Sequence, residues 1–272
     1  MKSHSLSIFT RTPLHVGIGS SVGALDQPVH RERHSHHPII PGSAIKGVIR
    51  NHYYHLKGET FCEGLFGQAD NNSGQAGLLS FTEAKVLLFP VRSAAGAFAM
   101  VTCNTALSRL CRDKKILIEI PNPHEGNCLA TDLCKIDDQI VLEEYVFHVE
   151  GSPSQEIINA VCKGLINDPI LDAATERLVI LSDEDFSFFV KNATEIRNHN
   201  RLNPETGTVD GSGFFNEEVI PAETLFFASI FETRQIKEEQ NILSDFGEET
   251  LLQFGGNATA GLGFCTVKSQ PI

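Results

Sequence analysis

The sequence contains no apolar run long enough to span a bilayer. VLLFPV (86–91) is among its longest apolar runs, and the first residues, MKSHSLSIFTRT, hold no apolar segment of a signal peptide. We therefore expect a cytoplasmic protein with no membrane partner. The seven cysteines include no CxxC pair, which argues against both a disulfide framework and a thiolate zinc site. Reduced, buried thiols are the expected state.

Positive charge is scarce overall but concentrated near the N-terminus. The net charge is -12, yet residues 1–58 hold seven Lys or Arg against two acids, Asp26 and Glu32. Eight of the eleven histidines lie in the same segment. A basic first fifth on an acidic chain predicts one surface that faces a polyanion such as nucleic acid, although an interface with an acidic protein fits as well.

The 272 residues, 41% of them hydrophobic, are expected to form one domain, 1–272, of the α+β class. Residues 6–17 alternate as a strand does, residues 19–42 have the Gly, Pro and His content of a long loop, and Ser43 is a candidate N-cap for a helix. Further strands are expected at 115–120 and 140–149, helices at 154–166, 182–192 and 242–254, and a long hairpin at about 195–225. Strands and helices do not alternate regularly, so a doubly wound parallel sheet is not expected.

Two segments could bind phosphate. The glycine loop FGGNATAGLGF (254–264) could expose several backbone N–H groups as an anion-binding nest, although a simple turn is the alternative. The helix that starts near Ser43 could attract an anion through its free N–H groups, with Lys46 adding a charge. For Lys46 and Arg50 the alternative is a solvated helix face.

The histidines of the long loop, which are His30, His34, His36 and His37, raise the question of a metal. Pro28 and Pro38 bracket them, and no cysteine or second histidine pair lies nearby to complete a tetrahedral site, so we expect no zinc. Asp26 is the single acid at the start of this loop. A carboxylate beside a phosphate-binding surface repels its ligand unless it binds a divalent ion or transfers a proton. An Asx turn within its own loop is the alternative.

Several motifs together resemble the RAMP superfamily of CRISPR proteins, in particular the backbone subunits of type III-B (Cmr) effector complexes that cleave target RNA. The resemblance covers most of the chain. It rests on the following segments: TPLHVGIGSSVGALDQPVHRERH, IIPGSAIKGVIR, FTEAKVLLFPVRSAAGAFAMVTC, FFNEEVIPAETLF and GGNATAGLG.

The resemblance implies a ferredoxin-like, RRM-like RAMP palm with an inserted thumb β-hairpin and a C-terminal glycine-rich loop. Such subunits stack head to tail along a guide RNA with other Cmr subunits, and they cut target RNA at regular intervals. Asp26 falls on the cleavage-loop acid of the family. It would assist attack by a 2'-hydroxyl on the adjacent phosphate, directly or through a divalent metal, Mg²⁺ or Mn²⁺.

The resemblance also implies roles for other residues. Glu217 or Glu218 could supply a second acid, and His15 could assist. The expected guide-RNA contacts are His15, Lys46, Gly255, Gly256, Asn257, Gly261 and Gly263, with Arg31, Arg33 and Arg50 as less certain phosphate contacts. Two other functions stay open: a structural RNA-binding filament subunit without catalysis, and a stand-alone RAMP protein that processes guide precursors.

Overall fold

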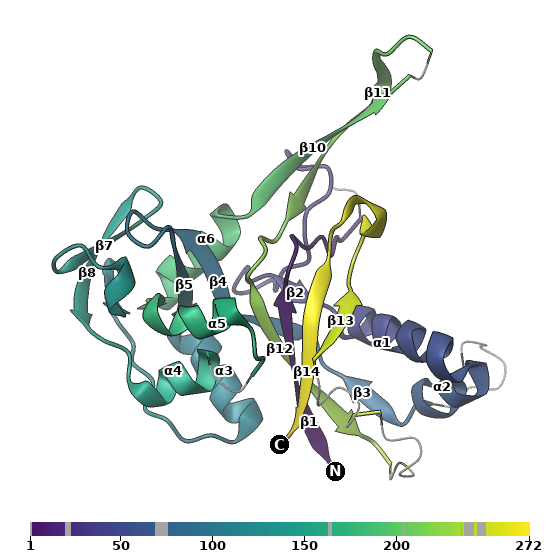
Figure 1. The fold of residues 1–272 in the computed structure, drawn as a ribbon, viewed down its shortest axis with the longest axis horizontal. Helices are drawn as coiled ribbons and strands as arrows, with labels where there is room; N and C mark the ends of the chain where they lie inside the picture. The colour runs from purple at the N-terminus through teal and green to yellow at the C-terminus, as the bar shows by residue number, and fades with distance from the viewer. Residues whose placement is uncertain are drawn as a thin grey trace.

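The computed structural model describes residues 2–19, 23–68, 76–162, 165–203, 205–234, 236, 242–243 and 249–272. Twelve strands within these ranges form one mixed sheet, and a separate two-stranded hairpin projects from it (Figure 1). No helix within the described ranges has the length and apolar character needed to cross a membrane.

The first lobe is built around β1 (Ser3–Thr10), which lies antiparallel between β14 (Phe264–Pro271) and β12 (Leu225–Glu232). The edge beyond β14 is β13 (Thr250–Gln253). Leu6, Ile8 and neighbouring apolar residues are buried in the core between this sheet and its helices. The remaining elements of the lobe are β2 (Ile39–Ile40), α1 (Gly42–Lys57), α2 (Glu59–Phe66) and β3 (Leu79–Phe81).

The second lobe shares the long strand β4 (Ala84–Arg92) with the first. From β4 the sheet continues through β5 (Phe98–Cys103), β9 (Leu178–Leu181), β6 (Asn127–Ala130), β8 (Tyr145–Gly151) and β7 (Gln139–Leu142). The helices of this lobe are α3 (Asn104–Lys114), α4 (Gln155–Cys162), α5 (Pro169–Ala173) and α6 (Asp183–Asn192). Short 3-10 turns lie at Asp132–Cys134, Ala174–Glu176 and Ala258–Ala260.

The projecting hairpin consists of β10 (Glu195–Leu202) and β11 (Val209–Val219), within the range where the sequence predicts one (Figure 1). Its base pairs Glu195 with Val219 and Arg197 with Glu217. Because β11 leads through Ile220 towards β12, the central sheet holds the base of the hairpin in place.

Three local predictions differ from the structure. Helix α1 begins at Gly42 with Pro41 as its N-cap, so Ser43 lies inside the first turn; Pro41 has the extended backbone of an N-cap residue. The 140–149 strand is two strands, β7 and β8, joined by a tight turn at Glu143 and Glu144. The long loop 19–42 also contains short backbone bridges, including Gly17 with Val29 and Arg31 with Pro38.

Two further predictions fail because periodicity does not reveal pairing partners. Residues 116–120 alternate between half-buried and exposed, but they belong to no strand of the described sheet. Ile118 and Ile120 pack on the core instead. Residues 250–253, predicted as part of a helix, form β13 because they pair antiparallel with Phe264–Val267 of β14.

Candidate functional site

Asp26 lies at the base of the projecting hairpin. The backbone N–H of Asn216 on β11 donates to Asp26 Oδ2 at 2.9 Å, and the Asp26 N–H donates to Asn216 Oδ1 at 2.8 Å. These reciprocal bonds join residues 190 positions apart in the sequence. The side chain is nevertheless exposed to solvent. The contact therefore fixes the position of an accessible carboxylate.

The backbone next to Asp26 continues this attachment. Gln27 donates its N–H to the Asn216 carbonyl at 3.2 Å and accepts one from the Glu218 N–H at 3.0 Å. Residue 27 thus pairs with β11 in a short parallel bridge. Asp26 bonds to a distant strand rather than to its own loop as in the alternative of an Asx turn, and the hairpin base determines where Asp26 lies.

Glu217 lies on one face of the hairpin base and is fully buried, at 0% exposure. Asn257 of the glycine loop donates its side-chain N–H to Glu217 Oε1 at 2.7 Å, and His199 Nε2 of β10 lies 3.1 Å from Oε2. His15 Nδ1 lies 2.7 Å from the Glu218 carbonyl oxygen and 3.5 Å from Glu217 Oε1. This carboxylate therefore joins the hairpin, the glycine loop and the segment around His15.

Glu218 is also buried, and it faces the other way because neighbouring strand residues point to opposite faces. Its carboxylate accepts the Val29 N–H at 3.0 Å, an Arg31 guanidinium N–H at 2.5 Å and the Thr194 hydroxyl at 2.9 Å.

Arg31 was predicted as a phosphate contact, but its guanidinium is engaged inside the protein. Besides its ion pair with Glu218, it donates to the carbonyl oxygens of His36 and Val190, each at 2.8 Å. These acceptors lie on three different segments of the chain. The structure thus places Arg31 as the link between the loop, α6 and the hairpin.

The second half of the loop is held by α3 and α6. Arg109 of α3 donates to Glu32 Oε2 at 3.0 Å, and Ser35 also donates to this carboxylate. Burial raises the pKa of Glu32, but the hydrogen bonds from Ser35 and Arg109 outweigh it and hold the pKa below its usual value. His34 lies 3.2 Å from the Arg109 guanidinium.

His37 is buried in the same region. Its Nε2 lies 3.0 Å from the Ser187 hydroxyl, and its ring meets Phe186 edge to face. Burial lowers the pKa of His37 to about 4, so the ring is neutral at physiological pH. No cluster of three or more His, Cys, Asp or Glu able to hold a metal occurs among the described residues. His34 and His37 thus attach the loop to the second lobe.

The glycine loop packs directly on the segment around His15. The N–H groups of Gly256 and Gly263 donate to the carbonyl oxygens of His15 and Pro13, and those of Ala260, Gly261 and Leu262 donate within the loop. A Cβ at Gly255 would lie 1.9 Å from the His15 oxygen, and its φ is +73°. These five N–H groups are already bonded, so the loop shapes the site more than it offers the predicted nest.

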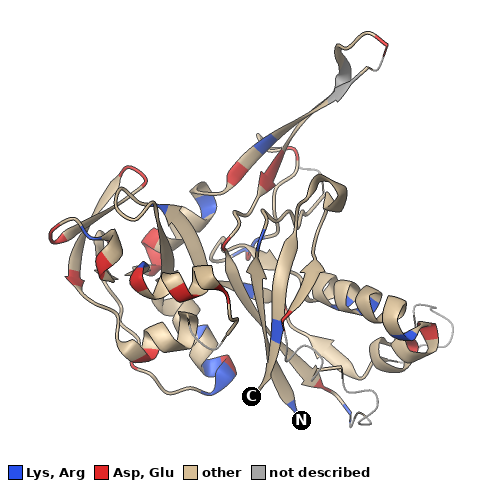
Figure 2. Ribbon diagram, in the orientation of Figure 1, with Lys and Arg blue, Asp and Glu red and all other residues tan. Residues whose placement is uncertain are grey.

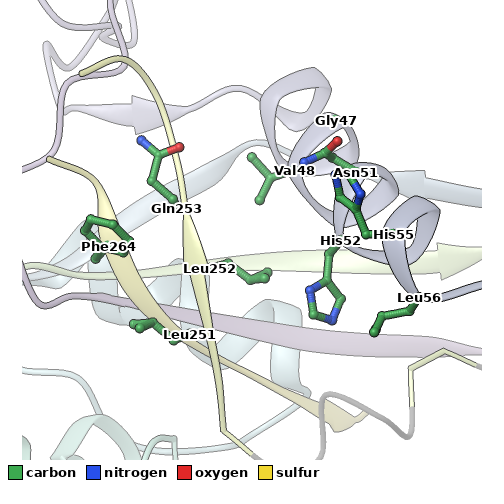
Figure 3. A pocket seen from close by; sticks show the side chains of 10 residues that line it. All are labelled: Gly47, Val48, Asn51, His52, His55, Leu56, Leu251, Leu252, Gln253 and Phe264. Carbon is green, nitrogen blue, oxygen red and sulfur yellow. The ribbon is translucent and has the colours of Figure 1, made fainter. Parts of the chain in front are cut away.

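The remaining predicted cations are Lys46 and Arg50 on helix α1 and Arg33 on the loop before it. Ile45, Ile49 and Tyr53 bury one face, whereas Lys46 and Arg50 are partly exposed and Arg33 of the loop is exposed. Figure 2 shows Lys and Arg along α1 and Asp and Glu concentrated in the second lobe. A cavity of about 510 Å³ separates α1 from β13, where His52 and Leu56 lie across from Leu251 and Leu252 (Figure 3).

The comparison with protein families decides the relationship. The model of the RAMP superfamily matches residues 8–266. This chain belongs to the RAMP superfamily. It is 34% identical to the CRISPR system Cmr endoribonuclease Cmr4 of Pyrococcus furiosus, over 100% of this chain and 97% of that protein.

Solved structures show the same RAMP fold. The crystal structure of oligomeric Cmr4 from Pyrococcus furiosus superposes with a TM-score of 0.79 at 30% identity, covering 100% of this chain and 99% of that chain. A chain in the cryo-EM structure of the Type III-B Cmr-beta bound to cognate target RNA gives a TM-score of 0.77 at 20% identity, covering 98% and 96%. At 20% identity, this second similarity shows a shared fold.

Sequence reasoning missed three residues of this RAMP site, Asn216, His199 and Arg109, and it gave a fourth, Asn257, a different partner. Asn216 is adjacent to Glu217 in a segment that the sequence already singled out. Asn257 was assigned to RNA rather than to a carboxylate. His199 and Arg109 come from a hairpin and a helix far away in the sequence, and no local pattern indicates their contacts.

Proposed function

We propose that this RAMP protein is the guide-RNA-binding backbone subunit of a type III-B CRISPR effector and that it cleaves target RNA endonucleolytically at regular intervals. The observation that carries the proposal is the exposed Asp26 carboxylate held at the base of a projecting hairpin. The relative that is an endoribonuclease by name supports the reaction class. The other Cmr subunits, a guide RNA and a target RNA are the proposed partners.

The architecture supports an arrangement of palm and thumb. In this proposal, residues 1–272 form one domain in which the large sheet and its helices are a ferredoxin-like palm and β10–β11 is the thumb. Copies stack head to tail along the guide RNA, a heterologous contact that produces a filament. The thumb projects from the palm (Figure 1), and Asp26 is bonded to Asn216 at its base. A thumb that interrupts the guide–target duplex would therefore place a displaced nucleotide near this carboxylate.

The proposed reaction is an internal attack within the target RNA. A 2'-oxygen bonds to its own adjacent phosphorus and the bond from phosphorus to the 5'-oxygen breaks, giving a 2',3'-cyclic phosphate and a 5'-hydroxyl. Asp26 takes the proton of the 2'-hydroxyl, and the leaving oxygen gains a proton from solvent. The hairpin base contributes by keeping the carboxylate in place, which removes an orientational cost from the reaction.

A divalent ion, Mg²⁺ or Mn²⁺, fits the donors at this place. Hard cations of this kind bind through one or two carboxylates together with substrate phosphates, and Asp26 provides one exposed carboxylate. When bound, the ion would neutralise charge that develops on the phosphate. Asp26 would hold the ion, and the Asn216 N–H would continue to orient its Oδ2.

The other predicted residues divide into two groups in this proposal. Lys46, Arg50 and Arg33 contact guide phosphates, because their side chains reach solvent near the basic N-terminal surface. Glu217, Glu218 and Arg31 position the loop, and the glycine loop positions His15. His15 donates from Nδ1 to the Glu218 carbonyl, so Nε2 is the atom that would accept a bond from RNA.

The test is cleavage of a target RNA by the reconstituted guide-loaded complex. We expect a regular ladder of products that end in cyclic phosphate and that disappears with EDTA. A 2'-deoxy nucleotide at one scissile position should remove that single band, and Asp26→Asn should remove all bands without loss of target binding. An unchanged ladder with Asp26→Asn would favour a structural filament subunit and assign the cut to another protein.

A further inference from the structure

An aromatic surface lies open on the second lobe, between β8 and α6. Tyr145 and Phe188 are 42% and 41% exposed, and their rings meet edge to face with centroids 5.1 Å apart. Cavities of about 310 and 360 Å³ flank this pair, and both are lined by Tyr145, Phe188 and Phe189. We call Tyr145, Phe188 and these two cavities the aromatic face. Each cavity has room for an aliphatic side chain.

Acidic side chains surround the aromatic face. Glu144 lines one cavity, Glu125 and Glu184 line the other, and all three are exposed. Glu143 forms an ion pair with Arg92 at 2.8 Å. Asp185 accepts bonds from the Gly126 N–H and the Ser182 hydroxyl. Among the described residues that line the two cavities there is no Lys or Arg. Such a surface repels RNA and fits an apolar side chain flanked by cations.

The same chain carries a segment with that chemistry. Leu117 is 99% exposed, shortly after the end of α3, in the segment that pairs with no described strand. Lys115 and Arg112 are exposed beside it; Arg112 also pairs with Asp113 at 3.0 Å, and Lys115 adopts a left-handed backbone conformation that ends the helix. We call Arg112, Lys115 and Leu117 the leucine knob. The side chain of Leu117 is therefore available to be buried by a partner, which would remove apolar surface from water.

The leucine knob and the aromatic face lie at opposite ends of the second lobe. Figure 2 shows Lys and Arg gathered at the end of α3 farthest from the β7–β8 hairpin. The two surfaces therefore cannot meet within one chain. They can meet between two copies, and because they differ from one another the contact would be heterologous and would repeat from copy to copy.

We propose that Leu117 of one copy inserts into the aromatic face of the next copy, with Lys115 and Arg112 facing the acids around it. This contact rests on the proposed filament and specifies the surfaces that join its subunits. It uses the acidic lobe, so it leaves Asp26 and the cations of α1 available for RNA. The apolar insertion provides the affinity, and the surrounding charges select the register.

Sedimentation velocity of the purified chain over a concentration series tests the contact. The wild type should form a series of oligomers. Leu117→Asp and Phe188→Ala should each sediment as monomers, because one lacks the insertion and the other lacks its receiving surface. A one-to-one mixture of the two variants should give a dimer and nothing larger, since one functional contact remains per pair. Leu251→Asp, which changes another half-exposed leucine on β13, should behave as wild type.

Charge exchange provides a second measurement that does not depend on packing. Glu144→Lys should weaken association about tenfold, and Lys115→Glu in the same chain should restore most of it. Oligomers of Leu117→Asp like those of the wild type, or a mixture that stays monomeric, would overturn the contact. The contact would also be overturned if Phe188→Ala abolished association while Leu117→Asp did not, because the aromatic face would then receive a different side chain.

The failure of this contact can be separated from the failure of the proposed function. If Leu117→Asp and Phe188→Ala assemble like the wild type and the complex cleaves target RNA, the proposed contact is wrong and the proposed function stands. A wild-type chain that remains monomeric overturns the contact together with self-association. Cleavage by the complete guide-loaded complex then decides independently whether Asp26 acts in the reaction.

Discussion

The two sides of the hairpin base contain acids with opposite surroundings. Asp26 is exposed and is held by hydrogen bonds between side chain and backbone that it exchanges with Asn216. Glu217 and Glu218 are buried, and hydrogen bonds within the protein engage all of their carboxylate oxygens. A buried carboxylate that already accepts internal hydrogen bonds is poorly placed to take a proton from a substrate. The exposed Asp26 is therefore placed to take a proton from a substrate, whereas the buried Glu217 and Glu218 hold the parts of the site together.

The largest stability effect should come from the glycine loop, where it packs on His15. Gly255→Ala would place a methyl group 1.9 Å from the His15 carbonyl oxygen at a φ of +73°. We expect a loss of roughly 3 kcal/mol or more in the free energy of unfolding, since both strain and overlap must be relieved.

Gly261→Ala is the matched control for this loop. Its φ is +83°, but a Cβ there would meet no atom within 4 Å. Only the backbone strain remains, so the cost should be about 1 kcal/mol. Equal losses in the two variants, measured by urea denaturation, would show that contact with His15 does not matter.

Removing the charge of Glu218 should cost about 3 kcal/mol of stability, because it leaves the Arg31 guanidinium without its buried partner. Chemical denaturation of Glu218→Gln measures this loss. Glu144→Gln, an exposed acid on the turn before β8, should change stability by less than about 0.5 kcal/mol. A stable Glu218→Gln variant with impaired cleavage would reverse the comparison, because it would assign chemistry to the buried acid.

His37 should make the protein less stable in mild acid. The buried ring has a pKa of about 4, against 6.5 for a free histidine, so the unfolded chain binds a proton between these values and the folded chain does not. Stability is therefore fully present above pH 6.5 and declines as the pH falls towards 4. From pH 7 to pH 5 this contribution should fall by about 2 kcal/mol.

His37→Gln should remove that part of the pH dependence. Glu32, Asp183, Arg109 and His34 also act on the ring electrostatically, so the same titration with Glu32→Gln serves as a control for their influence. Urea denaturation at pH 7, 6 and 5 provides the measurement. An identical slope in wild type and His37→Gln would refute the role of the buried ring.

The smallest effects should distinguish free cations from engaged ones. Lys46→Ala should weaken guide-RNA binding by a few-fold and reduce the slope of log affinity against log salt by about 1, with little change in stability. Arg31→Ala should instead lower stability, because Arg31 links Glu218 to the loop. Fluorescence anisotropy with labelled guide RNA measures both. A reduced salt slope for Arg31→Ala at full stability would contradict this distinction.

The sequence allowed prediction of the α+β class, the loop with Asp26 and the position of the hairpin, because these depend on local patterns and on resemblance. It did not allow prediction of β13 or of the unpaired segment 116–120, since pairing depends on strands far away in the chain. Asp26, Lys46 and the two glutamates could be singled out as residue types near motifs. The burial of the two glutamates could not be predicted, because Asn257, His199 and Arg31 contact these acids only after folding.

The most direct test of the central claim compares one substitution in two measurements. Asp26→Asn keeps an oxygen that can accept the Asn216 N–H, so thermal stability and target binding should remain unchanged. Single-turnover cleavage by the assembled complex should fall by about 100-fold or more, because the group that takes the proton is lost. Cleavage within a few-fold of wild type would contradict the account and remove Asp26 from the reaction.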